Sequence, residues 1–148
     1  MLDLWLAIAH HVLVFALFGV LFAELVLVRK GVDIATVTRV GRIDLMYGAV
    51  AGLILVVGFA RAVFAAKGWA YYAHNVFFHA KVGTFVLIGL LSIPPTIAYI
   101  LWRRSGVAPT DAEVAGVRRF LWIELVLFAA LPAFAAAMAR GYGELPYH

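Results

Sequence analysis

Four long apolar stretches follow one another along the chain, and short polar segments separate them. Each stretch is long enough to cross a bilayer as a helix, which takes roughly 20 mostly apolar residues. We expect membrane spans at about residues 4–28, 43–66, 76–102 and 120–139. Because the connections are short, neighbouring helices should be antiparallel. The pattern predicts one all-α domain over residues 1–148, an integral membrane four-helix up-down bundle.

The segment before the fourth span carries a helix-start pattern. Thr110-Asp-Ala-Glu113 places an acid three residues after a capping threonine, which is typical of a capping box. We expect a short cytoplasmic helix at about residues 110–118 that leads into the fourth span. Pro94, Pro95 and Pro132 lie within the third and fourth spans and should kink them.

Composition agrees with a lipid environment. Hydrophobic residues make up 66% of the 148 residues and charged residues only 14%, whereas about a quarter of a soluble domain is charged. The chain has no cysteine, which excludes disulfides, iron–sulfur clusters and thiol catalysis. The net charge is +4, but the basic residues stand at the ends of apolar runs. Their position indicates membrane orientation rather than nucleic-acid binding.

The basic residues favour one orientation. Two connections are rich in arginine and lysine, the first and the third: Arg29, Lys30, Arg39, Arg42, Arg103, Arg104, Arg118 and Arg119. The second connection has only Lys67, and the tail has only Arg140. The positive-inside rule therefore predicts that the first and third connections are cytoplasmic. We therefore expect a multi-pass protein of the bacterial cytoplasmic (inner) membrane. Both of its termini should face the periplasm.

Ionisable residues within the predicted spans form two levels. Such residues are costly in lipid and are candidates for function. The outer third should hold the residues His10, His11, Arg61, His79 and Lys81. Glu24 and Glu124 should lie in the inner third. At 100° per residue Glu24 lies within about 40° of His10 on the first helix, and His11 lies on the opposite side. If Glu24 faces the interior, His10 does so too.

Two histidines on facing helices are typical of a haem b site in a helical bundle. We expect His10 and His79 to be the axial ligands, with His11 as the weaker alternative to His10. Arg61 and Lys81 lie at the right level to pair with the propionates. Gly83, one turn from His79, would allow the ring to approach closely.

The leading hypothesis is a membrane b-type cytochrome that holds non-covalent haem b between the first and third spans, near the periplasmic side. Iron with two imidazole ligands has no open position, which favours electron transfer and an oxidoreductase role. A quinone or a periplasmic redox protein is then the expected partner. The apolar, glycine-containing helix faces also permit a homodimer in the bilayer.

Less specific interpretations stay open. Glu24 and Glu124 fit either a hydrogen-bonded structural pair or a path for protons. A membrane histidine such as His79 can serve only as an interhelical hydrogen-bond partner, and Lys81 can extend to the headgroups. The alternative to a cytochrome is therefore a non-catalytic accessory subunit or a small proton-coupled carrier.

Two stretches resemble the HemJ-type protoporphyrinogen oxidases, which are small membrane proteins that carry haem b. They are Leu4-Trp-Leu-Ala-Ile-Ala-His10 and Phe77-Phe-His-Ala-Lys-Val82. This resemblance implies haem ligation by His10 and His79, and it makes porphyrinogen oxidation a second alternative. The family continues its first helix with an arginine and a histidine, which are absent from Phe22-Ala-Glu-Leu-Val-Leu-Val28.

The chain as a whole resembles an uncharacterised bacterial family of four-span membrane proteins, domain of unknown function 2214. The residues that carry this likeness are His10, Glu24, Arg42-Ile-Asp-Leu-Met-Tyr-Gly48 and His79-Ala-Lys81. The resemblance implies the four-span fold and no particular activity.

Overall fold

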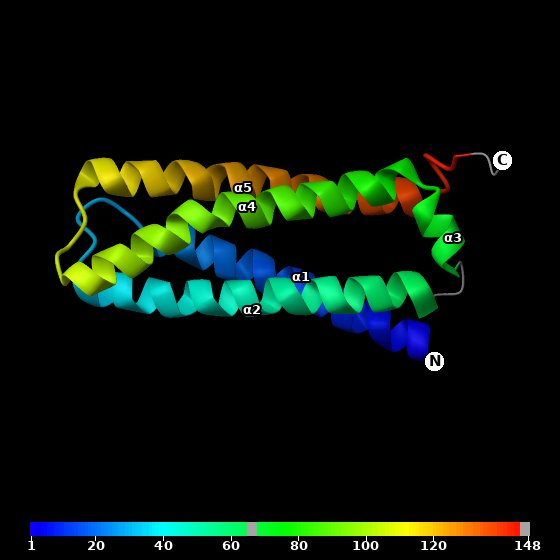
Figure 1. Ribbon diagram of the computed structural model, residues 1–148, viewed down its shortest axis with the longest axis horizontal. Helices are drawn as coiled ribbons and strands as arrows, with labels where there is room; N and C mark the ends of the chain where they lie inside the picture. The colour runs from blue at the N-terminus through cyan, green and yellow to red at the C-terminus, as the bar shows by residue number, and fades with distance from the viewer. Residues whose placement is uncertain (65–67, 146–148) are drawn as a thin grey trace.

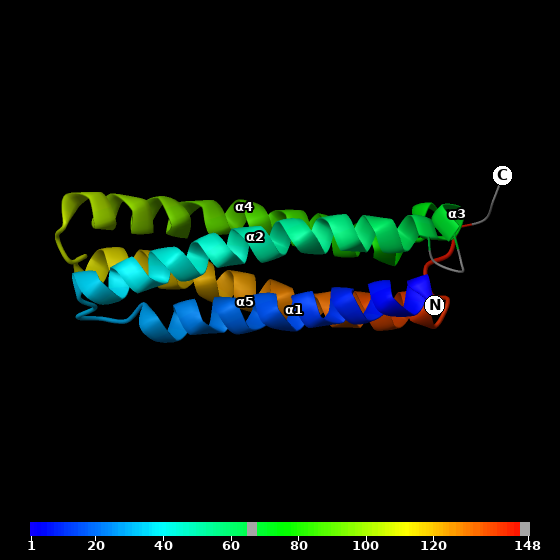
Figure 2. The ribbon, with the colours of Figure 1, turned by 90° about the horizontal axis from the view of Figure 1, so that it is seen from below.

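The computed structural model describes residues 1–64 and 68–145, and the described chain is almost entirely helical. Its elements are α1 (Leu2–Leu27), α2 (Ile34–Phe64), α3 (Gly68–Ala73), α4 (Val76–Ser105) and α5 (Asp111–Ala139). The four long helices are all long and apolar enough to cross a membrane. They run side by side in alternating directions (Figures 1 and 2). The predicted all-α four-helix up-down bundle is confirmed.

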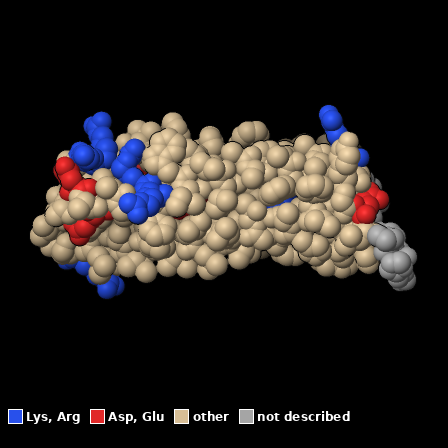
Figure 3. All heavy atoms as spheres, turned by 90° about the horizontal axis from the view of Figure 1, so that it is seen from above, with Lys and Arg blue, Asp and Glu red and all other residues tan. Residues whose placement is uncertain are grey.

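The bundle has two chemically different ends. The described parts of both termini and the short helix α3 lie at one end, here called the terminal end (Figure 1). The opposite end, here called the basic end, carries the α1–α2 and α4–α5 connections. Arginines and lysines gather there, and the middle of the molecule is almost free of charge on the face shown in Figure 3. Large apolar side chains such as Phe15, Val56 and Val126 are exposed on the outside of the long helices, as a lipid environment allows.

The helices at the basic end extend further than the apolar stretches predicted. Helix α2 begins at Ile34, nine residues before the expected start at residue 43. Its first turns carry polar residues outward, while Val37 and Val40 are buried. Asp33 accepts a hydrogen bond from the Thr36 N–H at 2.9 Å, and hydrogen bonds from Thr36 lower the pKa of this exposed carboxyl. A hydropathy pattern misses these turns because it detects only the apolar part of a helix, and these turns carry polar residues.

Helix α5 begins directly at its capping box. Thr110 accepts a hydrogen bond from the Glu113 N–H through its side chain, and the Glu113 carboxylate accepts one from the Thr110 N–H. The predicted capping box is therefore confirmed. The separate helix expected at residues 110–118 is instead the first part of one continuous helix that runs to Ala139.

The terminal end contains a corner that the hydropathy pattern did not predict. Helix α3 lies there, and the expected end of the second span at residue 66, with Lys67, falls outside the described residues. Asn75 caps α4 by accepting hydrogen bonds from the Phe77 and Phe78 N–H groups. Its side chain also donates to the carbonyl oxygen of Tyr142 at 3.1 Å. The corner thereby fastens the C-terminal tail to the start of α4.

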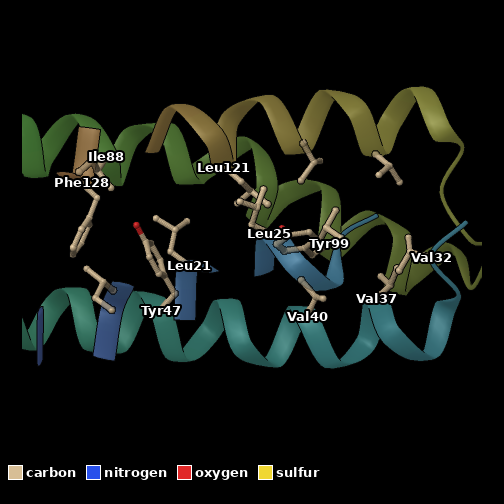
Figure 4. Close-up of a cluster of buried hydrophobic side chains, with 14 of the residues drawn as sticks. Leu21, Leu25, Val32, Val37, Val40, Tyr47, Ile88, Tyr99, Leu121 and Phe128 are labelled. Carbon is tan, nitrogen blue, oxygen red and sulfur yellow. The ribbon is translucent and has the colours of Figure 1, made fainter. Parts of the chain in front are cut away.

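A continuous apolar core runs along the interior (Figure 4). On α1 and its C-cap the buried positions share one face of the helix, at spacings that are mostly three, four or seven residues: they are His10, Leu17, Leu21, Glu24, Leu25 and Val28. Tyr47 and Tyr99 also lie within this core. The interior of the bundle is therefore mostly hydrocarbon, interrupted by a few polar side chains.

Arg118 closes the basic end of α1. Its guanidinium donates to the carbonyl oxygen of Leu25 at 2.7 Å and to that of Val28. The last carbonyl groups of a helix have no partner within the helix, and a cation also interacts favourably with that end of the helix dipole. Arg118 thus links α5 to the end of α1, although the two helices are far apart in the sequence.

Replacing Arg118 by leucine should lower the free energy of unfolding by about 1.5–3 kcal/mol, the range for hydrogen bonds to charged groups. The control is Arg119→Leu, because Arg119 is exposed at the neighbouring position and its loss changes the net charge equally. Unfolding of both variants in detergent micelles gives the comparison. Equal stability of the two variants would show that Arg118 does not support the end of α1.

The charge asymmetry predicts that the basic end faces the cytoplasm. Because the chain lacks cysteine, single cysteines can report the orientation. Tyr142→Cys marks the terminal end and Ser105→Cys marks the basic end, both at exposed positions. A membrane-impermeant maleimide should label the first variant in intact spheroplasts, and the second only after permeabilisation. The reverse result would place the termini in the cytoplasm.

Candidate functional site

A cavity of about 610 Å³ lies in the terminal half of the bundle, among all four long helices. Helix α1 moves away from α5 towards this end (Figure 1). Phenylalanines from α1, α2, α4 and α5 form much of the wall, and small residues of α5, including Ala135 and Ala136, form one side. Several wall residues, such as Phe15 and Phe59, are also exposed on the outer surface. The cavity is therefore apolar and borders the lipid.

Four polar side chains enter this apolar cavity: His10, His11, Arg61 and Lys81. His10 is only 7% exposed and lies within electrostatic range of Lys81 and Arg61. No acidic side chain lines the cavity in the described part of the chain. The structure thus brings together four of the residues expected in the site, counting His11 as the alternative ligand, and no acid among the described lining residues faces the two cations.

Two of these groups have buried polar atoms without a hydrogen-bond partner. They are Nδ1 of His10 and Nε of Arg61. Buried polar atoms are nearly always hydrogen-bonded, so each such exception suggests a place for a ligand. Gly58 faces His10, since a Cβ atom at Gly58 would lie 3.5 Å from the imidazole Cε1. The sequence reasoning missed Gly58, although it is one turn before Arg61 on the same face of α2.

His11 lines the cavity in a different way. Its Nδ1 donates to the carbonyl oxygen of Ala7 at 2.7 Å, because a carbonyl can only accept. In the neutral ring Nε2 then carries the free electron pair. A hydrogen bond from one ring nitrogen to a carbonyl is also how proteins orient histidine ligands. His11 therefore has a ligand-like tautomer, although its side chain is exposed.

His79 and Gly83 lie away from the cavity. The side chain of His79 is exposed, and its Nε2 donates to the carbonyl oxygen of Ala73 at 2.8 Å. Helix α4 lines the cavity with Phe78, Lys81, Val82 and Phe85, which share one helical face. His79 is two residues, or about 200°, from Lys81 around the helix. The structure does not bring His79 and His10 together. The expectation rested on their similar depth in the membrane, and depth does not determine how a helix is rotated about its axis.

A second polar group lies between the cavity and the basic end. Glu24, Asp44 and Glu124, here called the carboxyl cluster, come from α1, α2 and α5 and are all buried. The two glutamates are the inner-level residues expected from the sequence. The sequence pattern did not indicate their hydrogen-bond donors, Tyr47 and Tyr99. A signal was available for Tyr47, which is one turn after Asp44 on α2.

The described residues contain no group of three or more histidine, cysteine, aspartate or glutamate side chains placed to hold a metal ion. A metal ion bound by protein ligands alone therefore has no candidate site in residues 1–64 and 68–145. A metal held mainly by a prosthetic group needs only one or two protein ligands, and His10 or His11 can supply one.

Comparison with known proteins identifies the family but no activity. No curated protein and no solved structure matches the chain. One family model does match, over residues 2–143, and its description is "Predicted membrane protein (DUF2214)". That description agrees with the four apolar helices. Because the match covers nearly the whole chain, the protein belongs to the DUF2214 family of predicted membrane proteins.

Proposed function

We propose that this chain is a membrane b-type haem protein, with haem held non-covalently in the 610 Å³ cavity. One observation carries the proposal: an apolar cavity contains a buried histidine with an unpartnered nitrogen and two cations, and the described residues that line it include no anion. This combination fits a ligand that has an apolar body, acidic groups and a metal. Haem b has all three.

The individual groups match the needs of such a ligand. The cavity volume lies within the range of about 300–1,000 Å³ that is usual for small-molecule sites. Arg61 and Lys81 can each pair with a propionate, and charge-assisted hydrogen bonds of this kind are the strong ones. The small residues of α5 leave room for a flat ring against that wall. When bound, haem supplies one-electron redox chemistry.

The cavity favours α1 as the source of the iron ligand. His10 is the first candidate because it is buried, and His11 is the second because its Nε2 is free to bind. The lining residues of α5 include no histidine or methionine. Ligation by His79 would require its Nε2 to leave the Ala73 carbonyl and α4 to rotate. The proposed role is redox chemistry with a quinone, which can reach the cavity from the lipid, or with a redox protein at the terminal end; a single histidine ligand from α1 does not by itself restrict that role to electron transfer.

Absorption spectra of the purified protein test the proposal. Wild-type protein expressed with haem supplementation should show a Soret band, and His10→Ala should lose most of it because the buried ligand is gone. His79→Ala should retain the band, since His79 lies outside the cavity. Thermal unfolding of each variant checks that the fold is intact.

The same measurement separates the alternatives. Loss of the band in His11→Ala but not in His10→Ala would identify His11, rather than His10, as the iron ligand. Loss in both His10→Ala and His79→Ala would favour ligation from α1 and α4 together. A colourless wild-type protein after haem supplementation would contradict the proposal.

Lys81→Met should raise the free energy of unfolding of the ligand-free protein, by about 1 kcal/mol, since it removes a half-buried cation for which the described lining residues supply no anion. The same variant should bind haem more weakly than wild type. Lys30→Met, at an exposed position in the first connection, is the control and should change neither property. A loss of stability in ligand-free Lys81→Met would show that the protein itself satisfies this ammonium group.

A further inference from the structure

The carboxyl cluster is deeply buried and lacks a counter-ion. Glu24 is 2% exposed and Glu124 is 1% exposed. Glu24 lies within electrostatic range of Asp44 and Glu124, and Glu124 lies within electrostatic range of Asp44. Across the described residues no arginine or lysine forms an ion pair with any of the three. The nearby guanidinium of Arg118 donates to backbone carbonyls of α1 instead.

Hydroxyl groups from two helices contact the cluster. Tyr47 donates to Oε2 of Glu124 at 3.1 Å, and Tyr99 lies 3.4 Å from Oε2 of Glu24. Thr96 donates to Oδ1 of Asp44 at 2.9 Å. Each carboxyl therefore has one hydroxyl neighbour. These three acids and two tyrosines are the titratable groups that α1, α2, α4 and α5 present to the cluster.

The other oxygen of each glutamate has no partner. Oε1 of Glu24 and Oε1 of Glu124 are both buried without a hydrogen bond. An ionised carboxylate in such a place loses its hydration without gaining a cation, which disfavours the charged form. Three acids near one another cannot all ionise there. A bound proton removes the charge and turns an unpartnered oxygen into a donor.

A small cavity lies beside Tyr47 on the terminal side of the cluster, and no carboxyl of the cluster is among its lining residues. Its volume is about 220 Å³, and Tyr47, Ser92 and Phe85 are among its lining residues. This volume has room for several waters, and a buried water needs polar partners of the kind that the Tyr47 and Ser92 hydroxyls supply. Phe85 lines the large cavity as well. Tyr47 therefore stands between the Glu124 carboxyl and a space adjacent to the large cavity.

We propose that Glu24, Asp44 and Glu124 form a proton-binding site inside the membrane, which exchanges protons with the large cavity through Tyr47. In uptake, the Tyr47 hydroxyl passes its proton to Glu124 and receives one from a protonated water (H₃O⁺) in the small cavity, which returns to neutral water. One carboxylate becomes one carboxylic acid, and no electron is transferred. The site depends only on residues of this chain and does not require haem.

Infrared spectroscopy of the full chain in lipid nanodiscs tests the proposal. A carboxylic-acid C=O band should be present at neutral pH and should shift on exchange into D₂O. Glu24→Gln and Glu124→Gln, which keep the side-chain shape, should each remove part of the band. Glu144→Gln is the matched control, because Glu144 is exposed at the terminal end, and it should leave the band unchanged.

Tyr47→Phe tests the exchange route separately. This variant should keep the band but slow its shift in D₂O several-fold, because the hydroxyl is lost while the ring remains. Exchange as fast as in wild type would overturn the route through Tyr47. Absence of the band in wild-type protein at neutral pH would overturn the site itself, and that measurement needs no variant. A colourless protein that retains the band would contradict only the haem proposal.

Discussion

Water is absent from the hydrocarbon core of a bilayer, so each polar group of the chain must find its partner within the protein. The backbone meets this constraint by forming helices, and the helix ends need further partners. Arg118 supplies them for α1 by donating to two terminal carbonyls, and Asn75 supplies them for the start of α4. The same constraint leaves polar side chains only one favourable location, which is the bundle interior. The polar side chains of the large cavity and the carboxyl cluster both lie in the interior for this reason.

The bundle keeps its interior cations and acids apart. His10 and Glu24 share the buried face of α1 but are fourteen residues apart, or about 21 Å along the axis at the usual helical rise. Leu17 and Leu21 fill the space between them. If Arg61 or Lys81 lay beside Glu24, the charges would pair and neither group would need a ligand. Their separation leaves the cations available to an anionic group and the acids available to protons.

Loose packing near the terminal end allows the large cavity to exist. Helix α1 diverges from α5 there (Figure 1), and the face of α5 that lines the cavity carries several alanines. In a water-soluble protein a cavity of this size would substantially lower the free energy of unfolding, because its lining side chains lose packing contacts. In lipid the loss is smaller, because association of membrane helices does not depend on the hydrophobic effect. A membrane bundle can therefore hold an internal site at moderate cost.

The sequence by itself determined the membrane location, the number of long helices and the face of α1 that carries His10 and Glu24. These features follow from the length of apolar runs and from helical periodicity, which are local properties. Only the tertiary structure decided that Lys81 enters the cavity while His79 turns outward, and that Tyr47 and Tyr99 meet the acids. Helix α4 is apolar on nearly every side, and lipid is as apolar as a protein core. Its pattern therefore could not indicate its rotation, which contacts with the neighbouring helices set.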